Sequence, residues 1–307
     1  MMISKIDLRN LTFEELRDWT SNLGLESYRA EQVFRWIFQP DFQSFDQMTN
    51  LSKKWRDLFQ QQAYLSRLVI NRMEKSADGT RKFLFQLEDG EGIESVLIPE
   101  RGHYTLCISS QVGCAQRCRF CFTAKMGLKR NLKASEIINQ VLAVQGTLTA
   151  ADPLLTNIVM MGMGEPLDNF ENAVRALKSL LSPSGMRFSH RHVTLSTAGL
   201  IPEMKALGQL LPVNLAVSLN AADDTTRNQL MPINRKYPLE HLIRACREFP
   251  LPRGKRITFE YILIKGANDS PQAARALAKL LKGVKAKINL IPFNPHPGIG
   301  FEQPDDK

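Results

Sequence analysis

From Tyr104 onward, runs of residues that read as strands alternate with patterns that read as helices. The strand-like runs are YTLCISS, TNIVMMG, HVTLST, NLAVSL, ITFEYILI and KINLIPF. The helical patterns between most of them include SEIINQVLAVQ, NAVRALKSLL, LEHLIRACREF and PQAARALAKLL. Repeated strand–helix alternation predicts an α/β fold, in which right-handed crossovers join the strands of a parallel sheet. In such folds the functional groups lie at the carboxyl ends of the strands.

The part of the chain that precedes this alternation predicts two smaller segments. Residues 1–65 read as helices whose aromatic positions repeat like a buried face, which favours a helical core over stacking on nucleic-acid bases. Residues 66–100 read as a meander of strands, separated by the turn signals Asp78-Gly79 and Asp89-Gly90. We therefore expect a helical domain over 1–65, a β-rich connector over 66–100 and a core over 101–307.

The chain is basic, with 40 Lys and Arg against 31 Asp and Glu in 307 residues and a net charge of +9. A field of that sign attracts polyanions, and RNA, DNA and anionic membrane surfaces all fit it. No apolar run in the sequence approaches the roughly 20 residues that a membrane span needs. The first residues, MMISKIDLRNLTFEEL, lack the apolar stretch of an export signal. These features predict a globular cytoplasmic protein with a polyanionic partner.

Three of the five cysteines lie within eight residues, in the run Cys114-Ala-Gln-Arg-Cys118-Arg-Phe-Cys121, just after the first strand of the predicted core. Cysteines this close together favour metal binding in a reducing compartment over a disulfide framework. Three thiolates on one short loop can hold three irons of a cubane and leave the fourth iron open. A structural zinc site needs a fourth ligand, and the nearest histidine, His103, reads as a surface residue. The alternative is a chance group of buried cysteines.

The spacing C-x₃-C-x₂-C, followed by an aromatic residue and a series of β/α units, resembles that of the radical S-adenosylmethionine (SAM) enzymes. The motifs CISSQVGCAQRCRFC, VMMGMGEPLDN, VTLSTAG, LMPINRKYP and INLIPFNP are similar to those of the RlmN/Cfr family of adenine-methylating RNA methyltransferases. The likeness extends from the N-terminal helical segment to about Asn294. It is closer to the branch that modifies C2 of adenine in 23S rRNA and tRNA than to the C8 branch. It implies a partial (β/α)₆ radical SAM barrel with a small N-terminal helical domain.

The resemblance also implies roles for individual residues. In this family a [4Fe–4S] cluster, here on Cys114, Cys118 and Cys121, cleaves SAM to a 5′-deoxyadenosyl radical. Glycine lets the backbone approach the cofactor, and a carboxylate accepts hydrogen bonds from its amino group. The positions that match cofactor contacts are Gly164, Glu165, Ser196, Ser218, Leu219, Asn220 and Asn294. Without the resemblance, the glycine-rich turn would read as a tight loop, and Ser196 and Asn294 as strand-end caps or turn formers.

Two further residues receive catalytic roles from the resemblance. Glu94 matches the carboxylate assigned as proton acceptor, and Cys107 matches the cysteine that helps to resolve a covalent enzyme–RNA intermediate. Taken alone, Glu94 would be an exposed strand residue and Cys107 a buried core cysteine. The family often has His where this chain has Asn220, and Asn keeps hydrogen-bonding capacity but lacks a titratable group.

The sequence departs from the family near its C-terminal end. The family mechanism uses another cysteine, in an ACGQ-like segment, to carry the methyl group that is delivered to adenine. No cysteine follows Cys246, and the sequence ends at Lys307. Three explanations stay open: a sequence shorter than the whole protein, loss of methyl transfer, or another methyl carrier. We expect the first, because the sequence ends in a polar tail where the family continues into another helix.

The resemblance therefore implies an enzyme that methylates adenine C2 in 23S rRNA and tRNA, with a [4Fe–4S] cluster and SAM as cofactors. It further implies an electron donor such as a flavodoxin-type protein, and we expect a monomer. The absent cysteine favours one alternative, a cluster-containing RNA-binding protein that cleaves SAM without methyl transfer. A radical SAM enzyme with a small-molecule or protein substrate is another alternative, which the positive charge and the helical domain disfavour.

Overall fold

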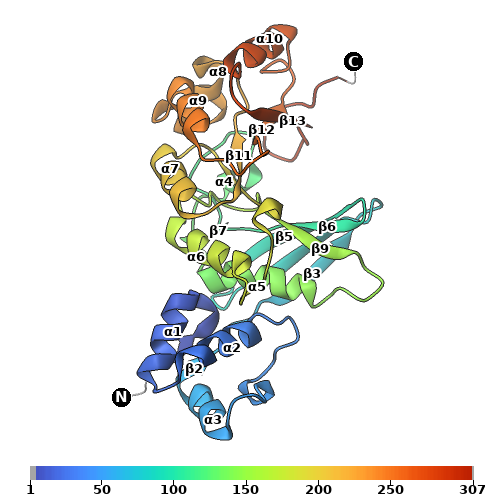
Figure 1. Ribbon diagram of the computed structural model, residues 1–307. Coiled ribbons are helices and arrows are strands. Elements are labelled where there is room, and N and C mark those ends of the chain that lie inside the picture. Colours follow the sequence, from blue (N-terminus) through green and yellow to red (C-terminus); the bar gives the residue numbers. More distant parts are fainter. Residues whose placement is uncertain (1–4, 306–307) are drawn as a thin grey trace. The chain divides into compact units, whose positions relative to one another are not determined.

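The computed structural model of this chain describes residues 5–305. The chain divides into two compact units, each assembled from segments that are distant in the sequence (Figure 1). The first unit comprises Met1–Ser109, Leu132–Ile158 and Glu171–Ser189. The second comprises Ser110–Asn131, Val159–Phe170 and His190–Lys307.

The N-terminal part of the first unit is helical, as the sequence predicts (Figure 1). Thr12 begins the first helix with a capping box, because its hydroxyl accepts from the Glu15 N–H while its own N–H donates to the Glu15 carboxylate. Two short strands at the ends of this segment pair in parallel. The elements are β1 (Ile6–Asp7), α1 (Phe13–Asn22), α2 (Ser27–Ile37), α3 (Lys53–Gln62) and β2 (Ala63–Tyr64).

Aromatic side chains form the core of these helices. Phe34 on α2 is 0% exposed, and its ring lies 5.4 Å from that of Phe13 and 4.7 Å from that of Phe38. Phe59 on α3 is also buried and contacts the Trp19 ring. The two Phe34 contacts are edge-to-face, and contacts of this kind stabilise the fold beyond the apolar area they bury. The prediction that the aromatic positions form a buried face is confirmed.

The first unit also contains a mixed sheet in the order β9-β6-β5-β4-β3, whose last four strands form an antiparallel meander. Along β5, buried side chains alternate with half-buried ones, so one face of the sheet lies on the core. The meander is continuous with β6, so the expected connector shares a sheet with the first strand of the expected core. The strands are β3 (Val69–Lys75), β4 (Arg81–Gln86), β5 (Gly92–Glu100), β6 (His103–Cys107) and β9 (Leu154–Met160).

Helix α5 (Ala134–Gln145) joins the sheet of the first unit to its helical segment. The buried Gln140 side chain accepts from the Ser95 hydroxyl and the Ser109 N–H. From the same helix, the Asn139 side chain accepts from Arg9, whose guanidinium also donates to two backbone carbonyls. The other α-helix between residues 132 and 190 is α6 (Phe170–Leu181).

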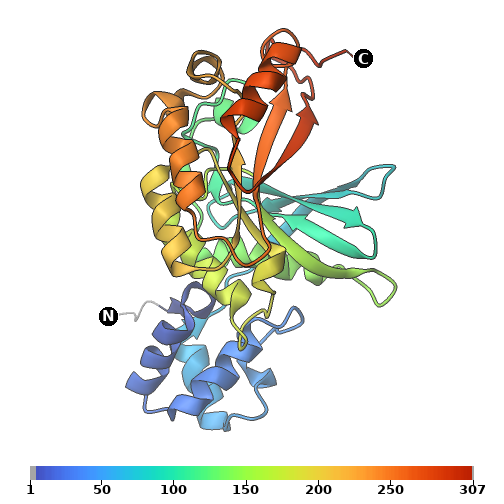
Figure 2. The ribbon, with the colours of Figure 1, turned by 45° about the horizontal axis from the view of Figure 1, so that its top comes forward.

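The second unit is built on four parallel strands in the order β10-β11-β12-β13. Helices follow the first three strands, and α7 and α9 contact each other (Figure 2). The strands are β10 (Val193–Thr197), β11 (Asn214–Ser218), β12 (Ile257–Leu263) and β13 (Ala286–Pro292), with a separate pair of β7 (Gln111–Val112) and β8 (Arg130–Asn131). The helices are α4 (Phe122–Lys125), α7 (Ile201–Leu210), α8 (Asp224–Leu230), α9 (Leu239–Glu248) and α10 (Pro271–Leu280).

All six strand-like runs of the predicted core are strands, and the α/β class is confirmed. The four helical patterns that the sequence shows clearly are α5, α6, α9 and α10. The division at residues 65 and 100 follows element type and stays a prediction, whereas the two compact units follow packing. Among residues 5–305, no helix is both long and apolar enough to cross a membrane.

Replacing Phe34 by Ala should destabilise the first unit by about 3–5 kcal/mol, because the change removes a fully buried ring and leaves a cavity. Urea denaturation followed by circular dichroism would measure the free energy of unfolding. The control is Tyr28→Ala on the same helix, where the side chain is 55% exposed and the loss should be within about 0.5 kcal/mol. Equal losses in the two variants would contradict an aromatic core centred on Phe34.

Candidate functional site

The three clustered cysteines lie in the second unit, in the loop that joins β7 to α4. Cys114, Cys118 and Cys121 all line one cavity of about 260 Å³. Residues at or just beyond the carboxyl ends of the strands border the same cavity, as expected for an α/β fold. The predicted cofactor residues that line it are Gly164, Glu165, Ser196, Ser218 and Asn220.

Two of the predicted cofactor residues do not line this cavity. The side chain of Leu219 is 0% exposed and belongs to the core, while Asn294 is exposed on the segment that follows β13. The contacts expected of these two residues stay predictions. Leu219 lies between Ser218 and Asn220, which both border the cavity, so its backbone passes the site even though its side chain points into the core.

Gly113 fixes the entry to the cysteine loop. Its φ is +78°, and a Cβ at this position would lie 1.7 Å from the carbonyl oxygen of Gly127. The Cys114 N–H donates to the same carbonyl at 3.2 Å, and the Lys129 N–H donates to Val112 at 2.9 Å. Only glycine allows this close approach of two backbone segments, so the loop is closed at its base by main-chain hydrogen bonds.

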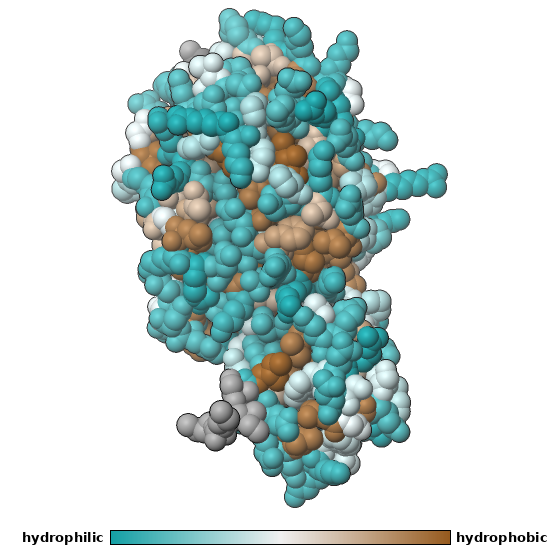
Figure 3. Space-filling view, turned by 90° about the vertical axis from the view of Figure 1, so that its left-hand side faces the viewer, coloured by the Kyte–Doolittle hydropathy of each residue, from teal (hydrophilic) through white to brown (hydrophobic). Residues whose placement is uncertain are grey.

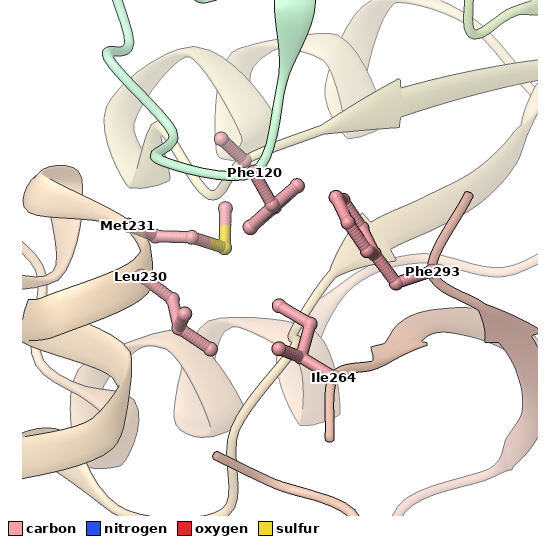
Figure 4. Close-up of a cluster of buried hydrophobic side chains, with 6 residues drawn as sticks. Phe120, Leu230, Met231, Ile264 and Phe293 are labelled. Atoms are coloured by element: carbon pink, nitrogen blue, oxygen red, sulfur yellow. The ribbon is translucent and has the colours of Figure 1, made fainter. Parts of the chain in front are cut away.

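The cysteine loop rests on an apolar cluster, shown in Figure 4. Its buried members are Phe120, Ala198, Leu230, Met231, Ile264 and Phe293. Phe120 of the loop points into this group, and Cys118 and Cys121 pack against it. The Arg119 N–H donates to the Leu230 carbonyl, at the end of α8, at 2.9 Å. The loop is therefore held both by apolar packing of its side chains and by a main-chain hydrogen bond.

The environment of the thiols suits metal binding. Burial raises the pKa of the Cys114 thiol to about 11 and holds the pKa of Cys118 well above its usual range. The neighbouring Cys121 adds to both increases, because thiolates that lie close together repel each other. A metal that replaces the protons removes this penalty, since it supplies positive charge to all the thiolates.

The donor set fits an iron–sulfur cubane. Within residues 5–305, no three His, Cys, Asp or Glu side chains are arranged to hold a single metal ion. A [4Fe–4S] cluster binds each thiolate at a different iron, so its ligands are spaced more widely than those of one ion. Three soft thiolates around one cavity meet that requirement.

Glu165 ties together the loops that border the cavity. Its carboxylate accepts from the Ala198 N–H at 2.6 Å and the Leu167 N–H at 3.0 Å, while its own N–H donates to the Gln111 side chain at 2.8 Å. The residue is 4% exposed, and burial raises its pKa to about 7. Gly164 has φ of +98°, and a Cβ there would lie 2.6 Å from Gln111. A buried carboxylate at a cavity edge suits a hydrogen-bond-donating or cationic ligand.

Ser196 and Ser218, near and at the carboxyl ends of β10 and β11, are half-buried and line the cavity. Asn220 is 1% exposed and has φ of +57°. Its Oδ1 accepts from the Ile262 N–H at 2.8 Å, and its Nδ2 donates to the Met231 sulfur at 3.2 Å. The Asn220 side chain thus joins β11 to β12, and its expected contact with the cofactor stays a prediction.

Sequence reasoning missed a second carboxylate of the cavity, Glu260 on β12. Glu260 pairs in register with Ser218 on one side and with Asn289 on the other, and the Asn289 amide donates to its carboxylate at 2.7 Å. Burial raises the pKa of Glu260. The signal in the sequence is a charged residue in the middle of the apolar run ITFEYILI, at a position where a parallel strand is usually apolar.

Glu94 and Cys107 lie close together on one face of the sheet in the first unit. Val96 on β5 pairs with Cys107 on β6, and Glu94 projects from the same face two residues before Val96. Such diagonal neighbours have Cβ atoms about 7–8 Å apart. The Lys82 ammonium lies 3.3 Å from the Glu94 carboxylate, and its hydrogen bond to that carboxylate raises the pKa of Lys82.

Two family models match this chain. The Radical SAM superfamily matches residues 108–278, and the ribosomal RNA large subunit methyltransferase N-terminal domain matches residues 6–65. The dual-specificity RNA methyltransferase RlmN of Desulfosudis oleivorans is 55% identical over 98% of this chain and 81% of its own length. The RlmN of Syntrophotalea carbinolica is 54% identical over 99% of this chain and 81% of its own length.

A solved structure agrees with these matches. The crystal structure of a radical SAM methyltransferase from Sphaerobacter thermophilus matches with a TM-score of 0.90 at 43% identity, covering 98% of this chain and 89% of that one. The α/β fold, the cysteine-lined cavity and the superfamily match together define a radical SAM enzyme. Within that class, the chain belongs to the RlmN family of RNA methyltransferases. The family resemblance of the motifs is thereby confirmed.

Replacing Gly113 by Ala should displace the cysteine loop, because a Cβ cannot occupy the space of the Gly127 carbonyl. The variant should retain less than about half of the iron bound by the unaltered protein after anaerobic reconstitution, since a misplaced shell loses ligand geometry. The control is Gly102→Ala, at a glycine with φ of +85° but nothing within 4 Å of its Cβ position. That change should cost about 1–3 kcal/mol of backbone strain and leave the iron content unchanged. Equal iron contents would argue against the constraint at Gly113.

Proposed function

We propose that this protein uses SAM and a [4Fe–4S] cluster to methylate C2 of adenine in 23S rRNA and tRNA. The observation that carries the proposal is the single cavity lined by three clustered cysteines and Glu165. The relatives named as dual-specificity RNA methyltransferases support RNA as the substrate and methylation as the reaction. The preference for C2 follows the similarity of the sequence motifs to that branch of the family.

In this proposal Cys114, Cys118 and Cys121 hold the cluster, which supplies the electron that cleaves SAM. Glu165 accepts a hydrogen bond from the amino group of SAM, and Gly164 lets the backbone come close. The hydroxyls of Ser196 and Ser218 are offered to the cofactor at the strand ends. The contacts of Leu219, Asn220 and Asn294 follow from the family pattern.

The charge of the cavity wall supports a cationic cofactor. Glu165 and Glu260 both line it, and no Lys or Arg is among the described residues that do so. SAM carries a positive sulfonium group, and two carboxylates on the cavity wall favour such a ligand electrostatically. The one-electron donor of flavodoxin type, the monomeric state and the cytoplasmic location are expectations that go with this proposal.

On the sheet of the first unit, we assign Glu94 as the proton acceptor and Cys107 as the residue that resolves the covalent intermediate. Their position as diagonal neighbours supports a joint role at one adenine. The Lys82 ammonium, 3.3 Å from the Glu94 carboxylate, holds that side chain on the same face of the sheet.

The surface suits a nucleic acid. The net charge of +9 attracts a polyanion, and the exposed basic side chains of the cysteine loop and α4 include Arg117, Arg119 and Lys125. The face shown in Figure 3 is mostly hydrophilic, with apolar residues in separate small groups. RNA enzymes that act on a base need it unstacked, so the substrate adenine should lie in a loop or be extruded from its stack.

The test of the proposal is an anaerobic assay with reconstituted protein, SAM, reductant and unmodified ribosomal RNA. Mass spectrometry should detect 5′-deoxyadenosine and 2-methyladenosine, and Cys118→Ala should reduce both at least about a thousandfold by removing a cluster ligand. Cys246→Ala is the matched control, because this cysteine on α9 is 2% exposed and does not line the cavity.

The products distinguish the possible results. Deoxyadenosine without methylated adenine would support the radical core and argue against methyl transfer by these residues. Neither product from protein that has bound iron and sulfide would overturn the proposal.

Glu165→Gln should weaken SAM binding about tenfold or more, because a hydrogen bond to a charged group is lost. Since the pKa of Glu165 is about 7, its ionised form becomes scarce at lower pH. Binding to the unaltered protein should therefore weaken as the pH falls below 7, until its affinity approaches that of the Gln variant, and should level off above 7. Equilibrium dialysis with labelled SAM, without reductant, measures this dependence.

Glu165→Gln should flatten the pH dependence, whereas Glu240→Gln, at an exposed position on α9, should leave both affinity and pH profile unchanged. Identical profiles for the Glu165 variant and the unaltered protein would remove Glu165 from the binding site.

A further inference from the structure

Arg227 on α8 carries a charge in the interior of the second unit. Its exposed fraction is 0%, and it is one of the largest fully buried side chains of the described residues. Burial lowers the pKa of Arg227 to about 10, so the guanidinium stays charged near neutral pH. A buried charge is costly unless an opposite charge and hydrogen bonds compensate for it. The groups that contact this guanidinium therefore show how far its charge is compensated.

All four hydrogen bonds of Arg227 go to neutral groups. The acceptors are the carbonyl oxygens of Ala198 (2.7 Å), Ser218 (3.1 Å) and Leu219 (3.1 Å) and the Oδ1 atom of Asn234 (2.9 Å). These carbonyls lie at and just beyond the carboxyl ends of β10 and β11. The guanidinium therefore holds together the backbone on which Ser218 and the other cavity residues are placed.

The charge of Arg227 has no direct counterpart. Throughout the described range 5–305, no carboxylate lies within ion-pair distance of its guanidinium. Asp224 on the same helix interacts with it electrostatically, but the Asp224 carboxylate is engaged by the Asn234 side chain at 2.8 Å and the Leu239 N–H at 2.9 Å. Each of the three guanidinium nitrogens has a hydrogen-bond acceptor, but the charge has no ion-pair partner.

The cysteine loop lies against the same helix. The Arg119 N–H donates to the carbonyl of Leu230, one turn beyond Arg227, and Phe120 packs beside Leu230 (Figure 4). Ala198 and Ser218, whose carbonyls accept hydrogen bonds from Arg227, line the same cavity as Cys118 and Cys121. The Arg227 guanidinium therefore lies directly behind the cavity wall that the predicted cluster ligands share.

We propose that Arg227 is the buried counter-charge of the iron–sulfur cluster and that it raises the reduction potential of the bound cluster. The inference rests on the proposed function, because it takes the three cysteines as cluster ligands. The described residues that line the cavity include no Lys or Arg. Arg117, Arg119 and Lys125 of the cysteine loop and α4 are exposed to solvent, whereas the Arg227 guanidinium is buried behind the cavity wall.

The direction of the effect follows from electrostatics. A cubane held by thiolates is anionic, and it gains a further negative charge when an external donor transfers one electron to it. A fixed positive charge in a medium of low dielectric constant stabilises the more negative of the two states. Arg227 therefore favours the reduced cluster. Arg227 is a positioning residue, acting through space and through the backbone of β10 and β11.

The experiment has to separate the charge of Arg227 from its hydrogen bonds. Arg227→Lys keeps the charge and loses most of the hydrogen bonds, whereas Arg227→Gln loses the charge. Arg9→Gln is the matched control, because Arg9 is 4% exposed and bonded to backbone carbonyls and an Asn side chain in the first unit. After anaerobic reconstitution, iron and sulfide are counted, and the cluster is titrated with dithionite under electron paramagnetic resonance detection.

Arg227→Gln should lower the equilibrium constant for reduction about tenfold, a potential about 59 mV more negative. Arg227→Lys should change that constant less than about threefold, and Arg9→Gln should leave it unchanged. An unaltered potential in Arg227→Gln with a full complement of iron would overturn the inference. Equal shifts in the Lys and Gln variants would assign the effect to backbone geometry and overturn the role of the charge.

A second variant covers the case in which Arg227→Gln does not fold. The double exchange Asp224→Asn with Asn234→Asp moves a carboxylate into contact with the guanidinium and keeps the composition unchanged. It should also lower the potential, and an unchanged value would overturn the inference. Absence of iron and sulfide from the unaltered protein would instead contradict the proposed function, so the two failures are distinguishable.

Discussion

The cavity wall depends on two hydrogen bonds made by the backbone N–H and carbonyl of Ala198. The Ala198 N–H donates to the Glu165 carboxylate at 2.6 Å, and its carbonyl accepts from Arg227 at 2.7 Å. One residue thus connects a buried acid to a buried base without direct contact between them. Each charge is costly in the interior unless its hydrogen bonds are complete, so the backbone beyond β10 is fixed at both ends. The apolar side of the same residue packs with Phe120, which places the cysteine loop on this frame.

The sequence predicts the strands of the core well, because buried parallel strands leave continuous apolar runs such as NLAVSL. The amphipathic helices α9 and α10 are visible for a similar reason, since one face is apolar at helical spacing. Helix α8 escapes this reasoning. It is short and polar, DTTRNQL, and its buried residues are Arg227 and Leu230, so the repeated apolar spacing of an amphipathic helix is missing. The grouping of the three cysteines at one cavity was predictable from their spacing, whereas the proposed cofactor contacts depend on the family pattern.

What the sequence could not show is the burial of polar groups. Arg and Glu are mostly exposed in proteins, so Arg227 gives no local sign of lying inside, and the place of Glu260 within an apolar run indicates burial without showing its partners. Their burial depends on acceptors and donors from distant segments, such as the Leu219 carbonyl and the Asn289 amide, which only the folded chain brings together. The reverse holds for Asn294, whose match to a family contact placed it in the site, although its side chain does not line the cavity.

The backbone conformation of Asn220 limits the residue types that fit at this position. Its left-handed conformation is rare for most side chains, but Asn, Asp and His adopt it several times more often than others. An exchange of His for Asn therefore keeps the turn after β11 even though it changes the acid–base properties of the side chain. The Asn220 carbonyl accepts a hydrogen bond from the Asn268 side chain at 2.7 Å. This main-chain bond requires the same backbone conformation whichever residue is present. The backbone conformation at this position thus limits which residues can occupy it, whatever their chemistry. A β-branched residue could not adopt this conformation without a change in the turn.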